Sequence, residues 1–254
     1  MEMGTGKSKV AIDTIGALYE AGKVKSALVI APKGVYDNWV KGEIPIHLPT
    51  RIPRKILRWV PAKTKRFEEE LTDFIVSKDM DLKIFVMNVE AFSSQRGTDV
   101  ATAFLYQNPD NIVIVDESTK VKNRKAARTK NLLSIKKYSK YRRILTGSPI
   151  TKSPMDLFSQ CNFLEEKALG FNSYFAFQAR YANVQRRTMG HRSFQQIVGY
   201  RRLEELSEKL DRFSCRVLKS ECLDLPPKVY TRREVPLTPE QNKLYTQMKK
   251  LALA

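Results

Sequence analysis

Short apolar runs alternate with helical patterns through the first 165 residues of this 254-residue chain. Runs rich in β-branched residues predict buried strands, and these runs lie at 27–30, 82–87, 112–115 and 143–145. Apolar residues at helical spacing predict helices at 8–20, 63–77, 98–107, 123–138 and 154–163. Alternation of this kind builds a mostly parallel sheet with helices on both faces. The sequence therefore predicts an α/β fold.

A glycine-rich string, Gly4-Thr5-Gly6-Lys7-Ser8, opens the first predicted helix. The glycines permit a tight turn, and backbone N–H groups at a helix N-terminus face an anionic phosphate. Lys7 would reach the β- and γ-phosphates of ATP, and the Ser8 hydroxyl would bind Mg²⁺. The match to the phosphate-loop spacing is partial, because Met1 stands where the pattern has a further glycine. An ordinary surface lysine at position 7 is the alternative interpretation.

Two adjacent carboxylates, Asp116 and Glu117, follow the predicted strand at 112–115. Ligands of parallel sheets bind at the carboxyl ends of the strands, so this position favours chemistry. Asp116 would hold Mg²⁺, and Glu117 would polarise the attacking water. Taken alone, the pair is equally well interpreted as a solvated acidic turn. A phosphate loop upstream makes the catalytic interpretation the better one.

Thr146, Gly147 and Ser148 follow the last predicted strand. Hydroxyl groups beside a flexible glycine suit a coupling element that senses the γ-phosphate and passes the signal on. By itself the string is more simply a turn of small residues. Trp39 also has a plain interpretation, because an aromatic residue on a helical face is more often part of the core than a stacking platform.

Basic residues dominate two segments of the chain, whose net charge is +18. Between Glu117 and Asp156 there is no acidic residue, and a second segment without one runs from Lys167 to Leu203. A merely soluble surface usually mixes both signs of charge. Nucleic acid is therefore the favoured partner. The first segment carries twelve basic residues: Lys120, Lys122, Arg124, Lys125, Arg128, Lys130, Lys136, Lys137, Lys140, Arg142, Arg143 and Lys152.

Several classes of protein are disfavoured by composition. No apolar run approaches the roughly 18–20 residues that span a bilayer, and the N-terminal residues do not resemble a signal peptide. Three cysteines and two histidines are too few for a disulfide framework or a zinc site. We therefore expect an intracellular, cytoplasmic protein in a reducing compartment, without a membrane partner.

The pattern changes after about residue 165. Aromatic and arginine-rich segments at 171–181 and 186–202 precede a predicted helix at 203–210, a strand-like segment at 213–218 and a closing helix from Pro239. We interpret residues 1–165 as an ATP-binding lobe and 166–254 as a mainly helical, basic appendage that bridges toward a second lobe. Arg186 and Arg187 belong to a segment that either contacts DNA or forms a mobile surface hairpin.

Taken in order, these motifs resemble the Swi/Snf-type DNA translocases of helicase superfamily two. The resemblance covers nearly the whole chain, and no single string decides it. The matching strings are 2–8, 28–32 with 38–39 and Glu43, 85–90, 116–118 with 122–123, 145–150 with Pro154, 156–157 and 163–164, 225–228, and 237–241 with Tyr245. Ser118-Thr119 departs from the family's commoner Ala-His, a variant associated with compact phage and bacterial members.

The resemblance implies a RecA-like P-loop lobe that uses ATP and Mg²⁺ to move on DNA, which is expected to be double-stranded and read with weak sequence preference. Its nucleic-acid contacts would be Pro32, Lys33, Lys122 and Asn123, together with Arg186 and Arg187. We expect the strand before the phosphate loop, the adenine-binding segment and a second lobe with arginine fingers to lie in a longer protein. The alternatives are a strand-separating DNA or RNA helicase, a restriction-system motor subunit, and a module that only binds nucleic acid.

Overall fold

The computed structural model of the chain describes residues 1–189, 192–224, 226 and 229–252. By internal contacts the chain divides into two compact units, Met1–Cys222 and Leu223–Ala254. The string at 225–228, which we expected to bridge two lobes, falls mostly outside the described residues. The division that we expect at residue 165 stays a prediction.

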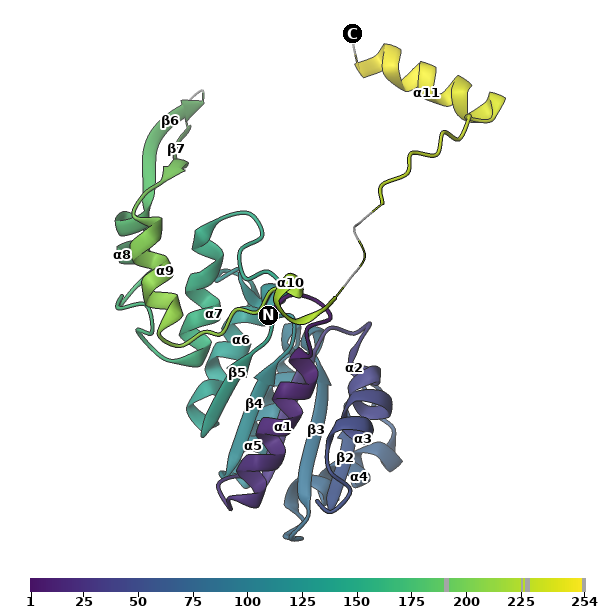
Figure 1. Ribbon diagram of the computed structural model, residues 1–254, viewed down its shortest axis with the longest axis vertical. Helices are drawn as coiled ribbons and strands as arrows, with labels where there is room; N and C mark the ends of the chain where they lie inside the picture. The colour runs from purple at the N-terminus through teal and green to yellow at the C-terminus, as the bar shows by residue number, and fades with distance from the viewer. Residues whose placement is uncertain (190–191, 225, 227–228, 253–254) are drawn as a thin grey trace. The chain divides into compact units, whose positions relative to one another are not determined.

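Five strands form one sheet in the first unit, in the order β2-β3-β1-β4-β5. All four neighbouring pairs are parallel, which confirms the predicted sheet. Figure 1 shows the N-terminus beside the carboxyl ends of these strands. The bounds are β1 Ser26–Ala31, β2 Arg54–Arg58, β3 Leu82–Asn88, β4 Asn111–Val115 and β5 Tyr141–Ile144.

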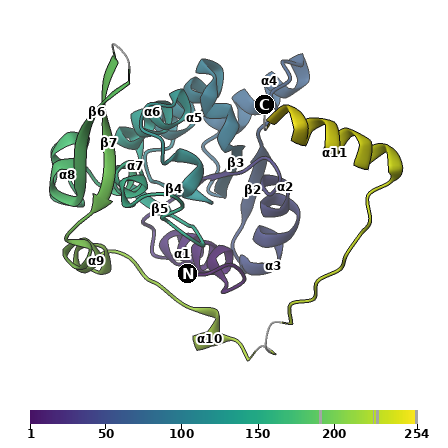
Figure 2. The ribbon, with the colours of Figure 1, turned by 90° about the horizontal axis from the view of Figure 1, so that it is seen from above.

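Helices cover both faces of the sheet, as predicted (Figure 2). Side chains alternate between the two faces of a strand, so Leu28 joins one buried cluster and Val29 the other. The first face packs against α4, α5 and α6, and the second packs against α1 and α3. The bounds are α1 Lys7–Glu20, α2 Tyr36–Asn38, α3 Ile44–His47, α4 Lys65–Val76, α5 Gln95–Gln107, α6 Ala127–Ile135 and α7 Leu157–Leu164. Short helical turns of other types are η1 Trp39–Glu43, η2 Val89–Ser93, η3 Ser118–Val121, η4 Lys136–Tyr138 and η5 Pro154–Asp156.

The structure corrects several boundaries in this unit. The sequence pattern missed β2, an edge strand whose charged residues leave only Leu57 buried. The helix predicted over 123–138 begins at Ala127, because the Asn123 side chain accepts a hydrogen bond from the backbone N–H of Lys125 (3.0 Å) and forms a competing turn. The last strand of the sheet begins and ends earlier than predicted, at Tyr141 and Ile144.

The appendage contains helices and one antiparallel hairpin. Its elements are α8 Tyr174–Tyr181, β6 Ala182–Met189, β7 Arg192–Tyr200, α9 Leu203–Asp211 and α10 Lys219–Cys222. A third buried cluster joins this part to α7, since Leu157 and Cys161 pack with Phe177, Tyr181 and Leu206. Through Cys222, therefore, the appendage shares a core with the lobe.

The predicted strand at 213–218 is wrong. Within the part of the chain that the structure describes, this segment pairs with no strand, and it runs instead beside the start of the chain. The backbone N–H of Glu2 donates to the carbonyl of Val217 (2.9 Å), and the N–H of Lys219 donates to the Glu2 carboxylate (2.7 Å). Residues 213–216 are exposed, and only Val217 and Leu218 are half-buried.

The second unit contains α11, Pro239–Ala252, which is the closing helix predicted from Pro239. Its apolar residues Leu244, Met248 and Leu251 are exposed. Among the described residues, no helix combines the length and the apolar character that crossing a membrane requires.

A carboxylate on α9 holds α8 in place, and this contact predicts a pH-dependent loss of stability. Hydrogen bonds from Arg180 and Tyr181 lower the pKa of Glu205 to about 2, from an ordinary 4.5. Because the pKa is lowered, the charged form contributes stability above pH 4.5, and this contribution is lost as the pH falls toward about 2. We expect Glu205→Gln to lower the thermal midpoint at pH 7 and to have a smaller effect at about pH 3.

Thermal melts followed by circular dichroism at the two pH values test this expectation. Glu208→Gln is the matched control, because Glu208 is exposed on the same helix and should change the midpoint little at either pH. A Glu205→Gln deficit of equal size at both pH values would show that the ionised carboxylate is not the stabilising group.

Candidate nucleotide site at the carboxyl edge of the sheet

Three of the predicted motifs meet where neighbouring strands end. β1 pairs with β4 and β4 pairs with β5, so the residues after these strands lie along one edge. Backbone bonds fix them there: Asp116 N–H donates to the carbonyl of Ile30 (2.7 Å), and Ser118 N–H donates to that of Leu145 (3.0 Å). The parallel register therefore brings the acidic pair and the hydroxyl-rich string together.

The phosphate loop turns tightly into α1. Gly4 and Gly6 have φ values of +78° and +83°, a conformation that glycine adopts without strain. The Lys7 ammonium donates to the carbonyl of Glu2 (2.7 Å), and the Thr5 hydroxyl donates to the same oxygen (2.7 Å). The first-turn N–H groups of a helix have no partner within the helix, which leaves them free to bind an anion.

Asp116 is held by two hydrogen bonds. Its Oδ2 accepts from the indole Nε1 of Trp39 (3.0 Å), and its Oδ1 accepts from the backbone N–H of Glu117 (2.9 Å). Burial raises the pKa of Asp116 above its ordinary value, while these hydrogen bonds and the charge of Lys7 oppose the rise. The carboxylate is thus fixed in orientation beside the phosphate-loop lysine.

Trp39 has a polar role that the sequence pattern did not reveal. We expected packing, and the side chain is indeed 2% exposed. Its N–H also orients Asp116 from a helical turn 77 residues earlier in the chain. No local spacing signals such a contact, because it depends on how η1 packs beside β1 and β4.

Glu117 contacts the hydroxyl-rich string. Its φ is +50°, which is unusual for a residue with a side chain. Its Oε1 accepts from the Thr119 hydroxyl (2.9 Å) and lies 3.5 Å from the donating hydroxyl of Thr146. Strained backbone of this kind is often found at functional sites. Glu117 is therefore directed at the strand-end turn rather than at bulk solvent.

Thr146, Gly147 and Ser148 connect this acid to the phosphate loop. A Cβ atom at Gly147 would lie 3.0 Å from Cγ of Met3, so glycine is what allows the close approach. The Thr146 hydroxyl accepts a hydrogen bond from the N–H of Ser148 (3.1 Å). The three predicted coupling residues thus lie between Glu117 and the loop that carries Lys7.

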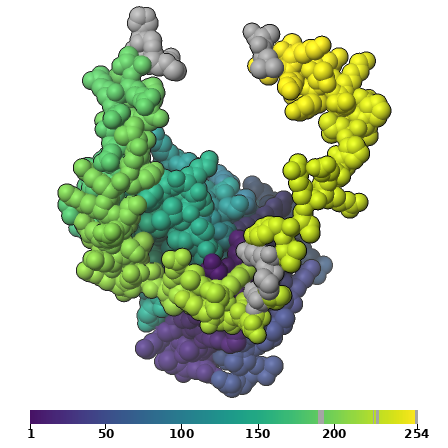
Figure 3. Space-filling model, turned by 45° about the horizontal axis from the view of Figure 1, so that its top comes forward, coloured from purple at the N-terminus to yellow at the C-terminus, as the bar shows by residue number. Residues whose placement is uncertain are grey.

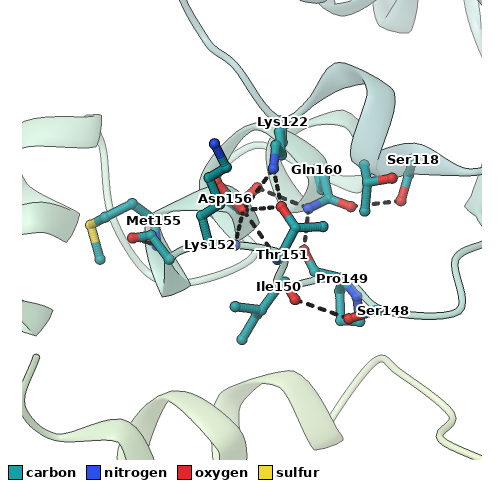
Figure 4. A network of polar contacts seen from close by, with 12 residues as sticks. Ser118, Lys122, Ser148, Pro149, Ile150, Thr151, Lys152, Met155, Asp156 and Gln160 are labelled. Atoms are coloured by element: carbon teal, nitrogen blue, oxygen red, sulfur yellow. Dashed lines mark hydrogen bonds and ion pairs between the residues drawn. The ribbon is translucent and has the colours of Figure 1, made fainter. Parts of the chain in front are cut away.

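A buried glutamine on α7 supports the same turn (Figure 4). Oε1 of Gln160 accepts from the Ser118 hydroxyl (2.6 Å), and its Nε2 donates to the carbonyls of Pro149 (2.8 Å) and Asp156 (2.9 Å). Gln160 and Ser118 are both fully buried. Sequence reasoning missed Gln160, since glutamine on a helix carries no motif signal. It links the residue after Glu117 to the segment after Thr146.

Asp156 forms hydrogen bonds with the end of the segment that follows Thr146. Its Oδ2 accepts from the backbone N–H groups of Thr151 and Lys152 (both 3.2 Å) and from the Lys122 ammonium (3.2 Å). Burial acts to raise the pKa of Asp156, but the hydrogen bonds, led by that of the Thr151 hydroxyl, leave it below the ordinary value. Figure 4 shows Lys122 and Thr151 converging on this carboxylate.

The donor set fits a magnesium ion that is shared with a nucleotide. Within the described residues, no cluster of three or more His, Cys, Asp or Glu side chains forms a metal site. Mg²⁺ usually takes one or two protein ligands and completes its shell with phosphate and water oxygens. Ser8 and Asp116 offer one hydroxyl and one carboxylate. The Ser8 hydroxyl makes no hydrogen bond to any residue that the structure describes.

The predicted nucleic-acid contacts lie in two places. Pro32 and Lys33 follow β1; the N–H of Lys33 donates to the Glu90 carboxylate (3.2 Å), and the Lys33 side chain is exposed. Lys122 is half-buried in its ion pair with Asp156, whereas Asn123 is exposed. Arg186 and Arg187 are exposed on β6, which belongs to a separate two-stranded sheet.

Comparison with known proteins gives consistent matches. The family described as the SNF2-related domain matches residues 1–254. The Mus musculus protein "DNA annealing helicase and endonuclease ZRANB3" is 30% identical over 261 residues, which cover 100% of this chain and 22% of that protein. A Danio rerio protein, "SWI/SNF-related matrix-associated actin-dependent regulator of chromatin subfamily A containing DEAD/H box 1A", is 26% identical over 246 residues, covering 96% and 23%.

A solved structure supports the fold. "Sulfolobus solfataricus SWI2/SNF2 ATPase core in complex with dsDNA" matches with a TM-score of 0.60 and 23% sequence identity, over 97% of this chain and 46% of that one. The chain thus spans about a fifth of the length of the curated relatives named above (22% and 23%).

Proposed function

Because the chain belongs to the SNF2-related domain family, we propose that it is the ATP-binding lobe of an ATP-driven DNA translocase. One observation carries the proposal. Glu117 is hydrogen-bonded to Thr146, while Gly147 lies against the phosphate-loop segment at Met3. An acid suited to activating water is therefore in contact with a turn that also touches the nucleotide loop, which is what coupling hydrolysis to movement requires.

The residues divide the chemistry among them. The backbone of Gly4, Thr5 and Gly6 surrounds the phosphates of ATP, and Lys7 leaves the carbonyl of Glu2 to bind the β- and γ-phosphates. Ser8 and Asp116 would hold Mg²⁺, which would neutralise phosphate charge. Glu117 orients the attacking water and accepts its proton. Negative charge on the γ-phosphate in the transition state must also be stabilised by a cation. We propose that an arginine of a second RecA-like lobe supplies it.

DNA binds along the carboxyl edge of the sheet through its phosphates. Lys33 offers an exposed ammonium beside Pro32, and Asn123 offers an exposed amide. Lys122 has three donors, of which Thr151 and Asp156 take two, so one remains for a phosphate. Contacts of this kind carry little sequence information. We therefore expect double-stranded DNA to bind with weak sequence preference and a steep dependence on salt.

ATP turnover with different nucleic acids tests the proposal. The 254-residue chain should hydrolyse little ATP even with DNA present, and a longer protein that supplies the second lobe should be stimulated best by duplex DNA. Brisk turnover by this chain alone would refute the need for a second lobe. If single-stranded RNA stimulated the longer protein best, the assignment as a duplex translocase would fail.

A further inference from the structure

A groove of about 760 Å³ lies between α8 and the β6–β7 hairpin, outside the nucleotide site. Figure 1 shows the hairpin extending past the carboxyl ends of the strands, on the side of the sheet where α7 lies. Figure 3 shows the same hairpin standing out from the lobe. Six polar side chains line the groove: Gln178, Asn183, Gln185, Arg186, Gln195 and Arg201. It is therefore rich in hydrogen-bond donors.

No carboxylate opposes the two arginines of the groove. None of its lining residues is acidic, and the whole segment from Lys167 to Leu203 contains no Asp or Glu. The next acid along the chain, Glu204, is exposed, and Glu205 is already bonded to Arg180 and Tyr181. A concave surface with unopposed positive charge attracts anions.

Hydrogen bonds within the protein hold the two arginine side chains of the groove in place. Arg201 donates to the carbonyls of Arg180 (3.3 Å) and Ala179 (2.6 Å), which fixes its guanidinium at one wall. Arg186 donates to the Ser193 hydroxyl (3.0 Å). The amide side chains of the groove make no hydrogen bond to any residue within the described ranges. Fixed cations beside free amide donors suit an oxyanion ligand.

The lining of the groove distinguishes neighbouring residues of the hairpin. Arg186 pairs with Gln195, and Arg187 pairs with Phe194. Arg186 and Gln195 line the groove, whereas Arg187 and Gln196 do not. The two neighbouring arginines, which the sequence could not tell apart, therefore have different surroundings.

We propose that this groove binds the phosphodiester backbone of DNA, as a contact separate from the carboxyl edge of the sheet. The inference rests on the proposed function, because it assumes that the lobe acts on DNA. Arg186 and Arg201 bind phosphate oxygens, and Gln195 donates to a neighbouring oxygen. The exposed ring of Phe175 at the groove wall covers the sugar side of the strand. The hairpin thus borders a duplex that lies along the strand ends.

Two matched pairs of variants test the proposal by fluorescence anisotropy with the whole chain and labelled DNA. Arg186→Ala should weaken binding about tenfold and reduce the slope of log K against log salt by about one phosphate contact. Arg187→Ala removes the same charge from a neighbouring position that does not line the groove, and it should change affinity less than about twofold and leave that slope unaltered. Gln195→Glu should weaken binding strongly, and Gln196→Glu, which adds the same charge at a neighbouring position that does not line the groove, should weaken it less.

The outcomes separate this inference from the proposed function. Equal losses within each pair would overturn the groove site, because only net charge would then matter. If Lys33→Ala lowered the affinity for DNA but Arg186→Ala did not, the groove would not be a DNA-binding site, and the translocase proposal would be unaffected. Absence of DNA binding by the unaltered chain at low salt would defeat both. Binding of duplex DNA and of single-stranded DNA is measured in parallel. The form whose affinity depends on Arg186 is the one that binds in the groove.

Discussion

Replacing Glu117 by glutamine is expected to stop ATP turnover while leaving ATP binding in place. Glutamine keeps the shape of the side chain and an oxygen that accepts from Thr119 and Thr146, but it cannot take a proton from water. Loss of a positioned general base typically slows a reaction by about 10² to 10⁴. Because the phosphate loop is unchanged, the affinity for Mg²⁺–ATP should alter by less than about threefold. This change is smaller than the one expected from losing a hydrogen bond to a charged group.

Phosphate release by the longer protein, with saturating duplex DNA, measures the first effect, and binding of a fluorescent ATP analogue to the 254-residue chain measures the second. Glu69→Gln is the control, because Glu69 is exposed on α4 and should leave both quantities unaltered. If Glu117→Gln retained more than about a tenth of the turnover, the role of general base would have to pass to another residue.

Replacing Lys7 by alanine should weaken ATP binding without unfolding the lobe. A hydrogen bond to a charged group contributes about 1.5–3 kcal/mol, so the dissociation constant should rise by roughly 10- to 150-fold. In the structure the ammonium donates only to the carbonyl of Glu2 among the described residues. Little stability should therefore be lost, and the thermal midpoint without nucleotide should stay close to that of the unaltered chain.

Lys9→Ala is the matched control for this change. Lys9 lies two residues further along α1, is exposed and pairs with Asp13, so its loss should leave ATP affinity unchanged. Isothermal titration with Mg²⁺–ATP measures both variants. Equal losses for Lys7 and Lys9 would indicate that general positive charge, rather than a placed ligand, attracts the nucleotide.

Much of the fold follows from local pattern. Buried parallel strands need continuous apolar runs, and those of β1, β3 and β4 predicted their positions to within one residue at each end. Strand β2 was not predicted, because an edge strand buries few side chains and tolerates charged residues. A hairpin was one of the two interpretations of the segment that forms β6 and β7, but its strands were not predicted, because its residues are mostly polar and exposed and show no apolar alternation.

The sequence by itself determined which residues follow the strands, and hence that Asp116, Glu117 and Thr146 gather at one edge of the sheet. Their roles remain predictions, but their grouping is a consequence of parallel topology, in which every carboxyl end lies on the same side. Tertiary structure alone decided that Trp39 orients Asp116, that Gln160 braces Ser118, and that Arg186 faces a groove while Arg187 does not. Each of these contacts depends on how elements that are distant in the sequence pack together, and residue spacing along the chain does not encode that packing.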